Sequence, residues 1–225
     1  MISSGAWSRK QLGYEFGDEK LLELALTHKS FSATNNERLE FLGDSVLGFV
    51  IAEALYRQES EVAEGGLSRL RASLVRRETL AEIARSIELG KFMRLGSGEA
   101  HSGNQQRQSI LADGLEALLG AVLMDGGFDA ASAVILRLFE ARLSSLPGLD
   151  TLKDPKTMLQ EALQATGLPI PEYKVEHEEG PPHARKFEVS CSIKDRSICT
   201  MGMGSSRRAA QQEAAAKALL LLADD

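Results

Sequence analysis

The sequence predicts two domains of different class, an all-helical domain at residues 1–143 and a small α+β domain at residues 153–225 with the order α-β-β-β-α. Apolar residues recur with the helical period throughout the first part of the chain. Near residue 173 the pattern changes to the two-residue alternation that is typical of strands. Residues 144–152 contain serine, proline and glycine in a short run, so we expect them to be a linker.

Composition is that of a soluble chain, because 43% of its 225 residues are hydrophobic and 26% are charged. The net charge of −6 argues mildly against a protein that binds any polyanion. Residues 1–152 hold 16 basic and 21 acidic side chains, whereas residues 153–225 hold 10 and 11. Nucleic-acid binding would therefore depend on local basic patches and on metal ions.

The N-terminal segment has no apolar run of signal-peptide length, and we expect no stretch to approach the roughly 18 apolar residues of a membrane helix. The sequence therefore predicts a cytoplasmic protein with no membrane partner. Cys191 and Cys199 lack metal-binding spacing, and we expect both to be buried thiols in a reducing compartment.

The first predicted helix is capped by Asp18 and ends near residues 27–30. His28 and Lys29 at that end either close the helix or contact a phosphate, and closing the helix is the commoner role for such residues. The next helix extends from residue 37 to about Tyr56.

The rest of the first domain also has helical patterns. Gly65 and Gly66 are expected to break the chain, residues 79–82 have capping-box spacing, and Asp129 can cap a last helix that ends near Leu143. Four arginines lie on the two middle helices and form a basic face, which is usually only solvated but also suits the phosphates of a nucleic acid: Arg69, Arg71, Arg76 and Arg77. The glycine-rich segment 95–104 lacks the Gly-Lys-Ser/Thr ending of a phosphate-binding loop, so we expect a flexible surface loop and no nucleotide cofactor.

The helix from residue 37 carries Glu37, Glu40 and Asp44 at i, i+3 and i+7, which places three carboxylates on one face. The opposite face is apolar and predicts a buried anchor for the helix. Phe41 projects beside the acids, where a large exposed aromatic ring needs a partner surface.

A second helix repeats this design, with Asp113 and Glu116 opposite an apolar face. Ala117 and Gly120 stand where a surface helix usually carries Lys or Arg, and small residues allow another helix to approach closely. Acids at helical spacing are more often a solvated face than a site. If these two helices face each other, however, five carboxylates converge and need cations, and oxygen ligands without His or Cys favour Mg²⁺ or Mn²⁺.

Residues 36–45 resemble the signature of the ribonuclease III family, and residues 110–120 resemble that family's second acidic block. The resemblance implies a homodimeric endoribonuclease that cuts both strands of double-stranded RNA. It also implies 5′-phosphate and 3′-hydroxyl ends, short 3′ overhangs, and processing of ribosomal RNA precursors and of some messenger and transfer RNA precursors.

The same resemblance implies roles for the acids. Glu40, Asp113 and Glu116 are expected to hold Mg²⁺, for which Mn²⁺ can substitute. Asp44 and Glu116 are expected to be essential to the chemistry, with Glu37 more peripheral in the same cluster. The metal is expected to activate water, to neutralise the attacked phosphate and to stabilise the leaving 3′ oxygen. Phe41 fits the family's dimer contact.

The predicted elements of the second domain are a helix at 156–165, strands at 173–177, 187–193 and 197–203, and a helix at 207–222. With the stretches 156–161, 180–183 and 204–215, this domain resembles the double-stranded-RNA-binding domain over its whole length. Such a domain recognises A-form duplex by shape across two minor grooves and the phosphates between them. The residues expected to contact RNA are Thr157, Gln160, Glu161, Gln164, His183, Arg207 and Arg208. Ala209 stands where the family often has another basic residue.

Three alternatives are open at this point. One is a duplex-RNA scaffold with a decayed nuclease domain, although all five acids are present. A metal-storing or oxygen-handling helical bundle would need Glu-x-x-His pairs, whereas Glu37 and Asp113 are each followed three residues later by Glu. A nuclease for single strands would need stacking aromatics on its sheet, where only Tyr173 and Phe187 occur.

Overall fold

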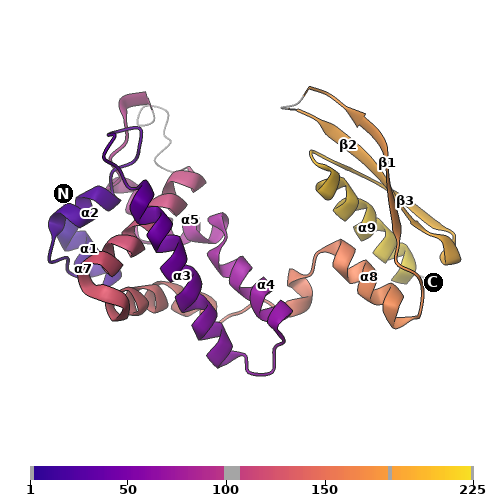
Figure 1. Ribbon diagram of the computed structural model, residues 1–225, viewed down its shortest axis with the longest axis horizontal. Coiled ribbons are helices and arrows are strands. Elements are labelled where there is room, and N and C mark those ends of the chain that lie inside the picture. The colour runs from indigo at the N-terminus through magenta and orange to yellow at the C-terminus, as the bar shows by residue number, and fades with distance from the viewer. Residues whose placement is uncertain (1–2, 99–106, 182–183, 224–225) are drawn as a thin grey trace. The chain divides into compact units, whose positions relative to one another are not determined.

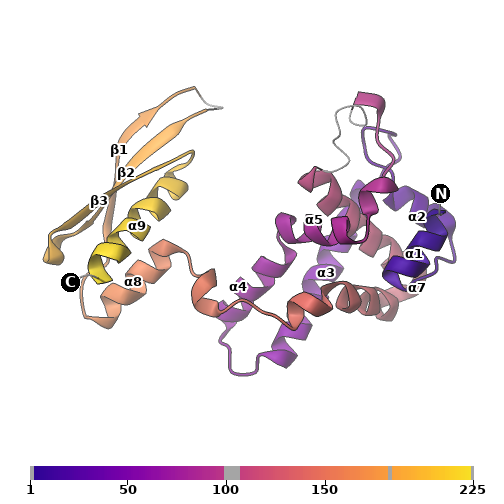
Figure 2. The same cartoon turned by 180° about the vertical axis from the view of Figure 1, so that it is seen from behind.

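The computed structural model describes residues 3–98, 107–181 and 184–223, and it divides into two compact units, Met1–Leu149 and Asp150–Asp225 (Figures 1 and 2). The first unit is helical, and the second is a three-stranded antiparallel sheet with helices. This is the fold class that the sequence predicts.

The helices of the first unit are α1 (Ser4–Leu12), α2 (Glu19–Ala25), α3 (Glu37–Gln58), α4 (Glu64–Val75), α5 (Arg77–Ser86), the short 3₁₀ helix η1 (Leu89–Lys91) and α7 (Gln108–Leu143). The central pair is α3 and α7, whose apolar faces are buried against each other and against the surrounding helices. The core therefore lies behind the acidic faces of both helices.

Two glycines allow α3 and α7 to pack backbone against backbone. A β-carbon at Gly43 of α3 would lie 1.7 Å from the Glu116 carbonyl oxygen, and one at Gly120 of α7 would lie 2.1 Å from the Leu39 carbonyl oxygen. Any side chain at either position would push the helices apart. The close approach predicted from the small residues of α7 is therefore present.

The N-terminal helix α1 has no counterpart in the sequence predictions. Its Trp7 is buried, donates a 2.7 Å hydrogen bond from Nε1 to the Ile87 carbonyl oxygen, and stacks on Phe92 at 4.6 Å between ring centroids. A single large aromatic residue therefore anchors α1 to the rest of the unit.

Asp125 ties the segment after α1 to α7. Its carboxylate accepts hydrogen bonds from the Tyr14 hydroxyl (2.7 Å) and from the backbone N–H groups of Gly17 (2.8 Å) and Asp18 (2.9 Å). Burial opposes ionisation, but these hydrogen bonds hold the pKa of Asp125 below its usual range. Burial and the bond to Asp125 raise the pKa of Tyr14 to about 12.

Several predicted boundaries shift. Asp18 caps α2 as expected, but α2 ends at Ala25, before residues 27–30. Gly65 and Gly66 lie inside the first turn of α4, so the expected break there is wrong.

The capping-box prediction is also wrong. Thr79 lies within α5, which begins at Arg77, and its hydroxyl donates to the Ser73 carbonyl oxygen at 2.9 Å. Tertiary contact with the end of α4 explains this buried threonine. Gly127 (φ 77°, ψ −175°) kinks α7 just before Asp129, the residue at which the sequence predicts the start of the last helix.

The expectation about membrane helices needs correction. Among the described residues, α7 is long and apolar enough to cross a membrane by length and composition. This property has a simpler source, because α7 is the central core helix and its apolar side chains contact the other helices of the unit. The core helix of a soluble protein shares this length and apolar composition, so the finding is only weak evidence for a membrane span.

The second unit contains η3 (Leu149–Leu152) at its start, then α8 (Pro155–Ala165), β1 (Glu172–Glu179), β2 (Lys186–Ile193), η4 (Lys194–Arg196), β3 (Ile198–Gly204) and α9 (Arg207–Ala223). The strand order is β1-β2-β3, and both helices pack on one face of the sheet. Alanines of α9 and leucines of α8 fill the core together with Cys191 and Ile193. Both cysteines are free, but only Cys191 is buried, so the prediction of a buried Cys199 is wrong.

The outer edge of β3 is covered by side chains of α9. Glu213 accepts the Met203 N–H at 2.8 Å, and Lys217 donates to the Met201 carbonyl oxygen at 2.8 Å. Glu213 and Lys217 also pair with each other at 2.9 Å. Two backbone groups that would otherwise be open to another strand are therefore satisfied within the unit.

Candidate active site

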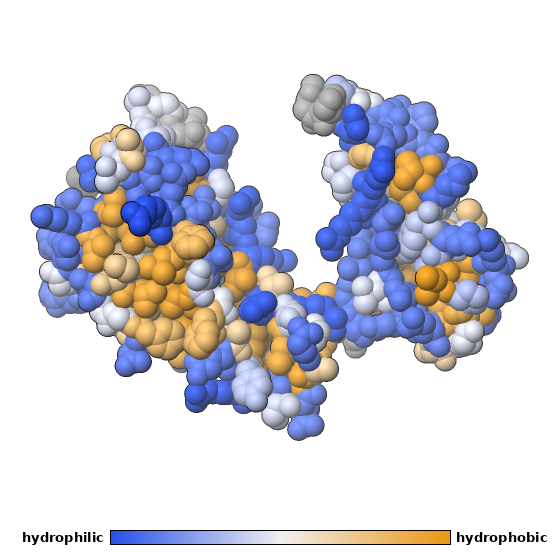
Figure 3. All heavy atoms as spheres, viewed as in Figure 1, coloured by the Kyte–Doolittle hydropathy of each residue, from blue (hydrophilic) through white to orange (hydrophobic). Residues whose placement is uncertain are grey.

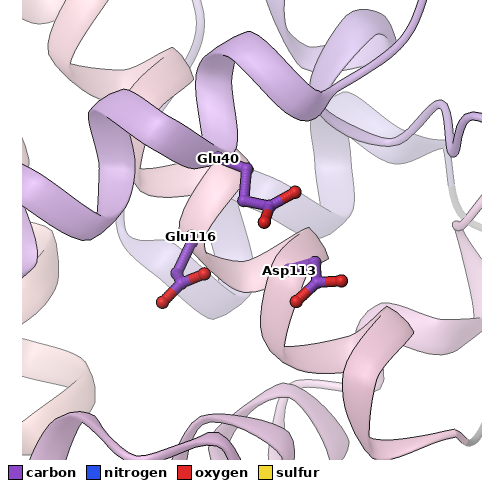
Figure 4. A group of neighbouring side chains, drawn as sticks. All are labelled: Glu40, Asp113 and Glu116. Carbon is purple, nitrogen blue, oxygen red and sulfur yellow. The ribbon is translucent and has the colours of Figure 1, made fainter.

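Three carboxylates from the two central helices converge. The contributing residues are Glu40 of α3 and Asp113 and Glu116 of α7, and one ligand oxygen from each lies within 4.8 Å of the others. Figure 4 shows the three side chains projecting into the same space between the helices. The face-to-face arrangement predicted from helical spacing is therefore present.

The other two predicted acids, Glu37 and Asp44, line the same open cavity of about 510 Å³ but lie outside this close group of three. Phe41 lines the cavity from α3 as well. The structure thus brings all five carboxylates to one cavity and places three of them within the reach of a single cation.

The electrostatics of the cluster resist full ionisation. Burial raises the pKa of Glu116 to about 8, and the negative charges of Asp44, Asp113 and Glu40 add to the shift. Burial, followed by the charges of Asp113 and Glu37, also raises the pKa of Glu40, and burial raises the pKa of Asp113. Without a cation, the cluster is therefore expected to retain protons near neutral pH.

Lys29 has a place that its sequence position did not predict. The Nζ atom of Lys29 lies 3.1 Å from Glu37 Oε1, and Lys29 lines the cavity. The interpretation of Lys29 as a residue that closes a helix is therefore wrong. The hydrogen bond and the charge of Lys29 hold the pKa of Glu37 below its usual range. His28 is not among the residues that line the cavity, and its Nδ1 lies 2.8 Å from the Ser30 hydroxyl oxygen.

The donor set fits a small, hard divalent cation. Magnesium binds oxygen at about 2.1 Å, so two oxygens on opposite sides of it are roughly 4.2 Å apart. The 4.8 Å spread of the three carboxylates is slightly larger, and small side-chain rotations would close it. The close group offers only carboxylate oxygens, which favours Mg²⁺ or Mn²⁺ over zinc.

Figure 3 shows exposed apolar side chains gathered on the helical unit, and one exposed apolar residue of this unit, Phe41, also lines the cavity. Phe41 is 77% exposed, and Phe49 and Phe128 are also exposed although their rings contact each other edge to face at 5.6 Å between centroids. The exposed large apolar side chains of the two central helices are Phe41, Phe49 and Tyr56 of α3 and Met124, Phe128 and Leu136 of α7. Apolar surfaces of this kind mark interaction sites.

The predicted RNA contacts of α8 are accessible. Gln160, Glu161 and Gln164 are exposed and Thr157 is partly exposed, and Thr157, Gln160 and Gln164 share one face of the helix at i, i+3 and i+7. Lys153 pairs with Glu161 at 2.7 Å, so Glu161 already has a partner within the unit.

The predicted phosphate contacts lie at the start of α9. Arg207 and Arg208 are both exposed, but Arg207 pairs with Glu178 of β1 at 3.0 Å. Lys156 joins the first turns of the two helices by donating from Nζ to Gln211 Oε1 at 2.7 Å. His183, the predicted contact to the second minor groove, and most of the segment 95–104 lie outside the described residues.

The chain has a helical unit with a carboxylate cluster, followed by an α-β-β-β-α unit that presents polar and basic helix faces. This combination defines an endonuclease for double-stranded RNA. The Ribonuclease-III-like family model matches residues 18–143, and the double-stranded RNA binding motif matches residues 155–222. The chain belongs to the ribonuclease III family.

Individual relatives agree with this assignment. Ribonuclease 3 of Hahella chejuensis is 54% identical over 96% of this chain and 96% of the relative. Ribonuclease 3 of Pseudomonas fluorescens is 51% identical over 99% of this chain and 97% of the relative. A solved nuclease domain of ribonuclease III from Campylobacter jejuni is 47% identical with a TM-score of 0.59, and it covers 60% of this chain and 95% of its own length. The three alternative functions left open by the sequence are accordingly set aside.

Proposed function

We propose that the protein is a Mg²⁺-dependent hydrolase of double-stranded RNA, with Mn²⁺ as a substitute for Mg²⁺. The observation that supports this most strongly is the convergence of Glu40, Asp113 and Glu116 within 4.8 Å. These three residues would hold the cation. When bound, it would supply Lewis-acid activation of water and would neutralise charge on the attacked phosphate.

In the proposed reaction, a water oxygen attacks phosphorus and the bond from phosphorus to the 3′ oxygen breaks. The products are a 5′-phosphate and a 3′-hydroxyl end. Asp44 and Glu116 line the cavity on opposite helices, where they can orient the water and accept its proton. Glu37 is held by Lys29 at the cavity wall, which supports a peripheral role.

We further propose that the active form is a homodimer in which Phe41 and the neighbouring apolar surface pack against a second copy. An apolar surface that includes a phenylalanine with 77% exposure needs such a partner. The related Campylobacter jejuni structure is described as having flexibility in a region involved in dimer formation. Two copies would supply one cluster per RNA strand, and offset cuts would leave short 3′ overhangs. Phe41→Ala should shift the mass measured by light scattering toward that of the monomer.

The proposed substrates are ribosomal RNA precursors and some messenger and transfer RNA precursors, processed in the cytoplasm. The exposed residues of α8 and α9 suit any A-form duplex, which is compatible with such a range. Loss of the protein from its cell should cause duplex-containing precursors to accumulate.

The decisive experiment incubates the full chain with a long RNA duplex, with and without Mg²⁺, and determines the fragment ends. Glu116→Gln should leave duplex binding in place and abolish cleavage. Glu140→Gln is the matched control, because Glu140 lies exposed near the other end of the same helix. Unchanged cleavage by Glu116→Gln would refute the assignment of the site.

A further inference from the structure

We propose that Arg77 binds a phosphate of the RNA backbone next to the bond that is cut, and so acts as a substrate-contacting residue of the reaction. This inference deepens the proposed function and rests on it. Arg77 is the first residue of α5 and is exposed, and its side chain lines the carboxylate cavity together with Leu80 of the same helix. It therefore faces the acids of α3 and α7 from a third element.

Arg77 differs from nearby basic residues in the partners of its side chain. Lys29, the other cation that lines the cavity, is paired with Glu37. The neighbouring Arg76 donates from Nε to Thr79 Oγ1 at 3.4 Å. Within the described residues, the Arg77 side chain has neither a hydrogen bond nor an ion pair, so its guanidinium donors remain open to a ligand.

The charges of the cavity indicate which ligand Arg77 would take. The described side chains that line it include five carboxylates, and Arg77 acts on Glu40, Asp113 and Glu116 through its charge without touching any of them. Once divalent cations neutralise these acids, Arg77 loses its counter-charge. The anion that enters this cavity during the reaction is a phosphodiester, and a guanidinium binds phosphate oxygens in a bidentate manner.

The position of Arg77 inside the cavity also indicates that the two domains contribute to different quantities, the cleavage rate and the duplex affinity. A phosphate contact inside the cavity would position the scissile bond against the acids, whereas α8 and α9 would supply most of the duplex affinity. The effect of Arg77 should therefore be found in the rate of cleavage and much less in the dissociation constant.

The test compares Arg77→Ala and Arg77→Lys with the unaltered full chain in single-turnover cleavage of a short RNA duplex at saturating Mg²⁺. Arg77→Ala should lower the rate about 10²-fold, as does loss of one donor to a developing negative charge, and Arg77→Lys should recover part of it. The Mg²⁺ concentration for half-maximal rate should stay equal or fall, because a positive charge has been removed from beside the acids. Arg9→Ala is the control for loss of a cation, since Arg9 lies on α1 and pairs with Glu15.

A second measurement identifies the partner of Arg77. A duplex with one methylphosphonate, which removes the charge of a single phosphate next to the cut, should slow the unaltered protein. The same duplex should slow Arg77→Ala no further. Three results would each overturn the inference. The first is that the rate reductions caused by Arg77→Ala and by the methylphosphonate multiply when both changes are present, and the second is a rate for Arg77→Ala within twofold of the unaltered protein. The third is a raised Mg²⁺ requirement of Arg77→Ala together with a lowered melting temperature. Failure of the unaltered protein to cleave would instead refute the proposed function.

Discussion

Replacing Gly43 with alanine should damage both the fold and the metal site, because it places a carbon atom where two backbones meet. A β-carbon there would lie 1.7 Å from the Glu116 carbonyl oxygen, and the obstacle is backbone that cannot rotate away. Restoring ordinary contact requires α3 and α7 to separate by more than about 1 Å. Glu40 would move with α3, and Asp113 and Glu116 with α7.

The expected cost follows from the size of this clash. Overpacking of a core costs about 1–3 kcal/mol, and the upper end applies where neither partner can yield. A loss of about 3 kcal/mol in a protein of this size lowers the melting temperature by roughly 6–12 °C. Displacement of a reacting group by 1 Å costs about 10²-fold in rate, and the wider cluster should also require more Mg²⁺.

Urea denaturation, together with cleavage rates across a Mg²⁺ titration, measures both effects. Gly65→Ala is the matched control, because a β-carbon at Gly65 in α4 would approach only the tip of Arg69, at 3.8 Å. That variant should gain up to about 1 kcal/mol, since alanine favours helix over glycine. Gly120→Ala should reproduce the damage from the other helix. Stability and Mg²⁺ dependence of Gly43→Ala equal to those of the unaltered protein would refute the backbone contact.

Three further predictions concern charge. In the presence of a metal chelator, the free energy of unfolding should fall as pH rises from about 5 to 8. Glu116 has a raised pKa and keeps its proton in the folded state over this range, whereas the unfolded state has lost it. Glu116→Gln should flatten that slope in thermal unfolding, and an unchanged slope would contradict the shift. Asp125→Ala should cost about 2 kcal/mol or more in urea denaturation, because Tyr14 and two backbone N–H groups lose their acceptor; a cost near zero would contradict this. Glu178→Gln should tighten duplex binding up to about fivefold in gel-shift titration by releasing Arg207, and unchanged affinity would show that this pair does not compete with RNA.

The convergence of the acids could be predicted from the sequence because it depends on short-range information. Helical spacing fixes which face of α3 carries Glu40 and which face of α7 carries Asp113 and Glu116. The small residue Gly120 indicated that another helix approaches closely, and the structure shows a backbone contact there.

The cations of the cavity could not be predicted in the same way. Arg77 reaches the acids only because α5 packs against α7, and Lys29 does so because the segment before α3 folds back toward Glu37. Nothing in the local pattern distinguishes these two residues from other surface cations. Trp7 likewise anchors α1 through a carbonyl 80 positions away in the sequence.

Two errors have local causes instead. The spacing from Thr79 to Glu82 matches a capping box, but the helix begins earlier because Thr79 bonds to the end of α4. Cys199 alternates with the buried residues Ile198 and Thr200 along β3, so strand period alone places it on the outer face. The prediction used only the spacing of the two cysteines and therefore missed this signal.

The covered edge of β3 has a consequence for self-association. Glu213 and Lys217 occupy two of its outward-facing backbone groups, the Met203 amide and the Met201 carbonyl, and this makes the edge a poorer template for an identical chain. Sheet extension at this edge is therefore disfavoured, and the exposed apolar side chains of the helical unit are the better candidates for a contact between copies.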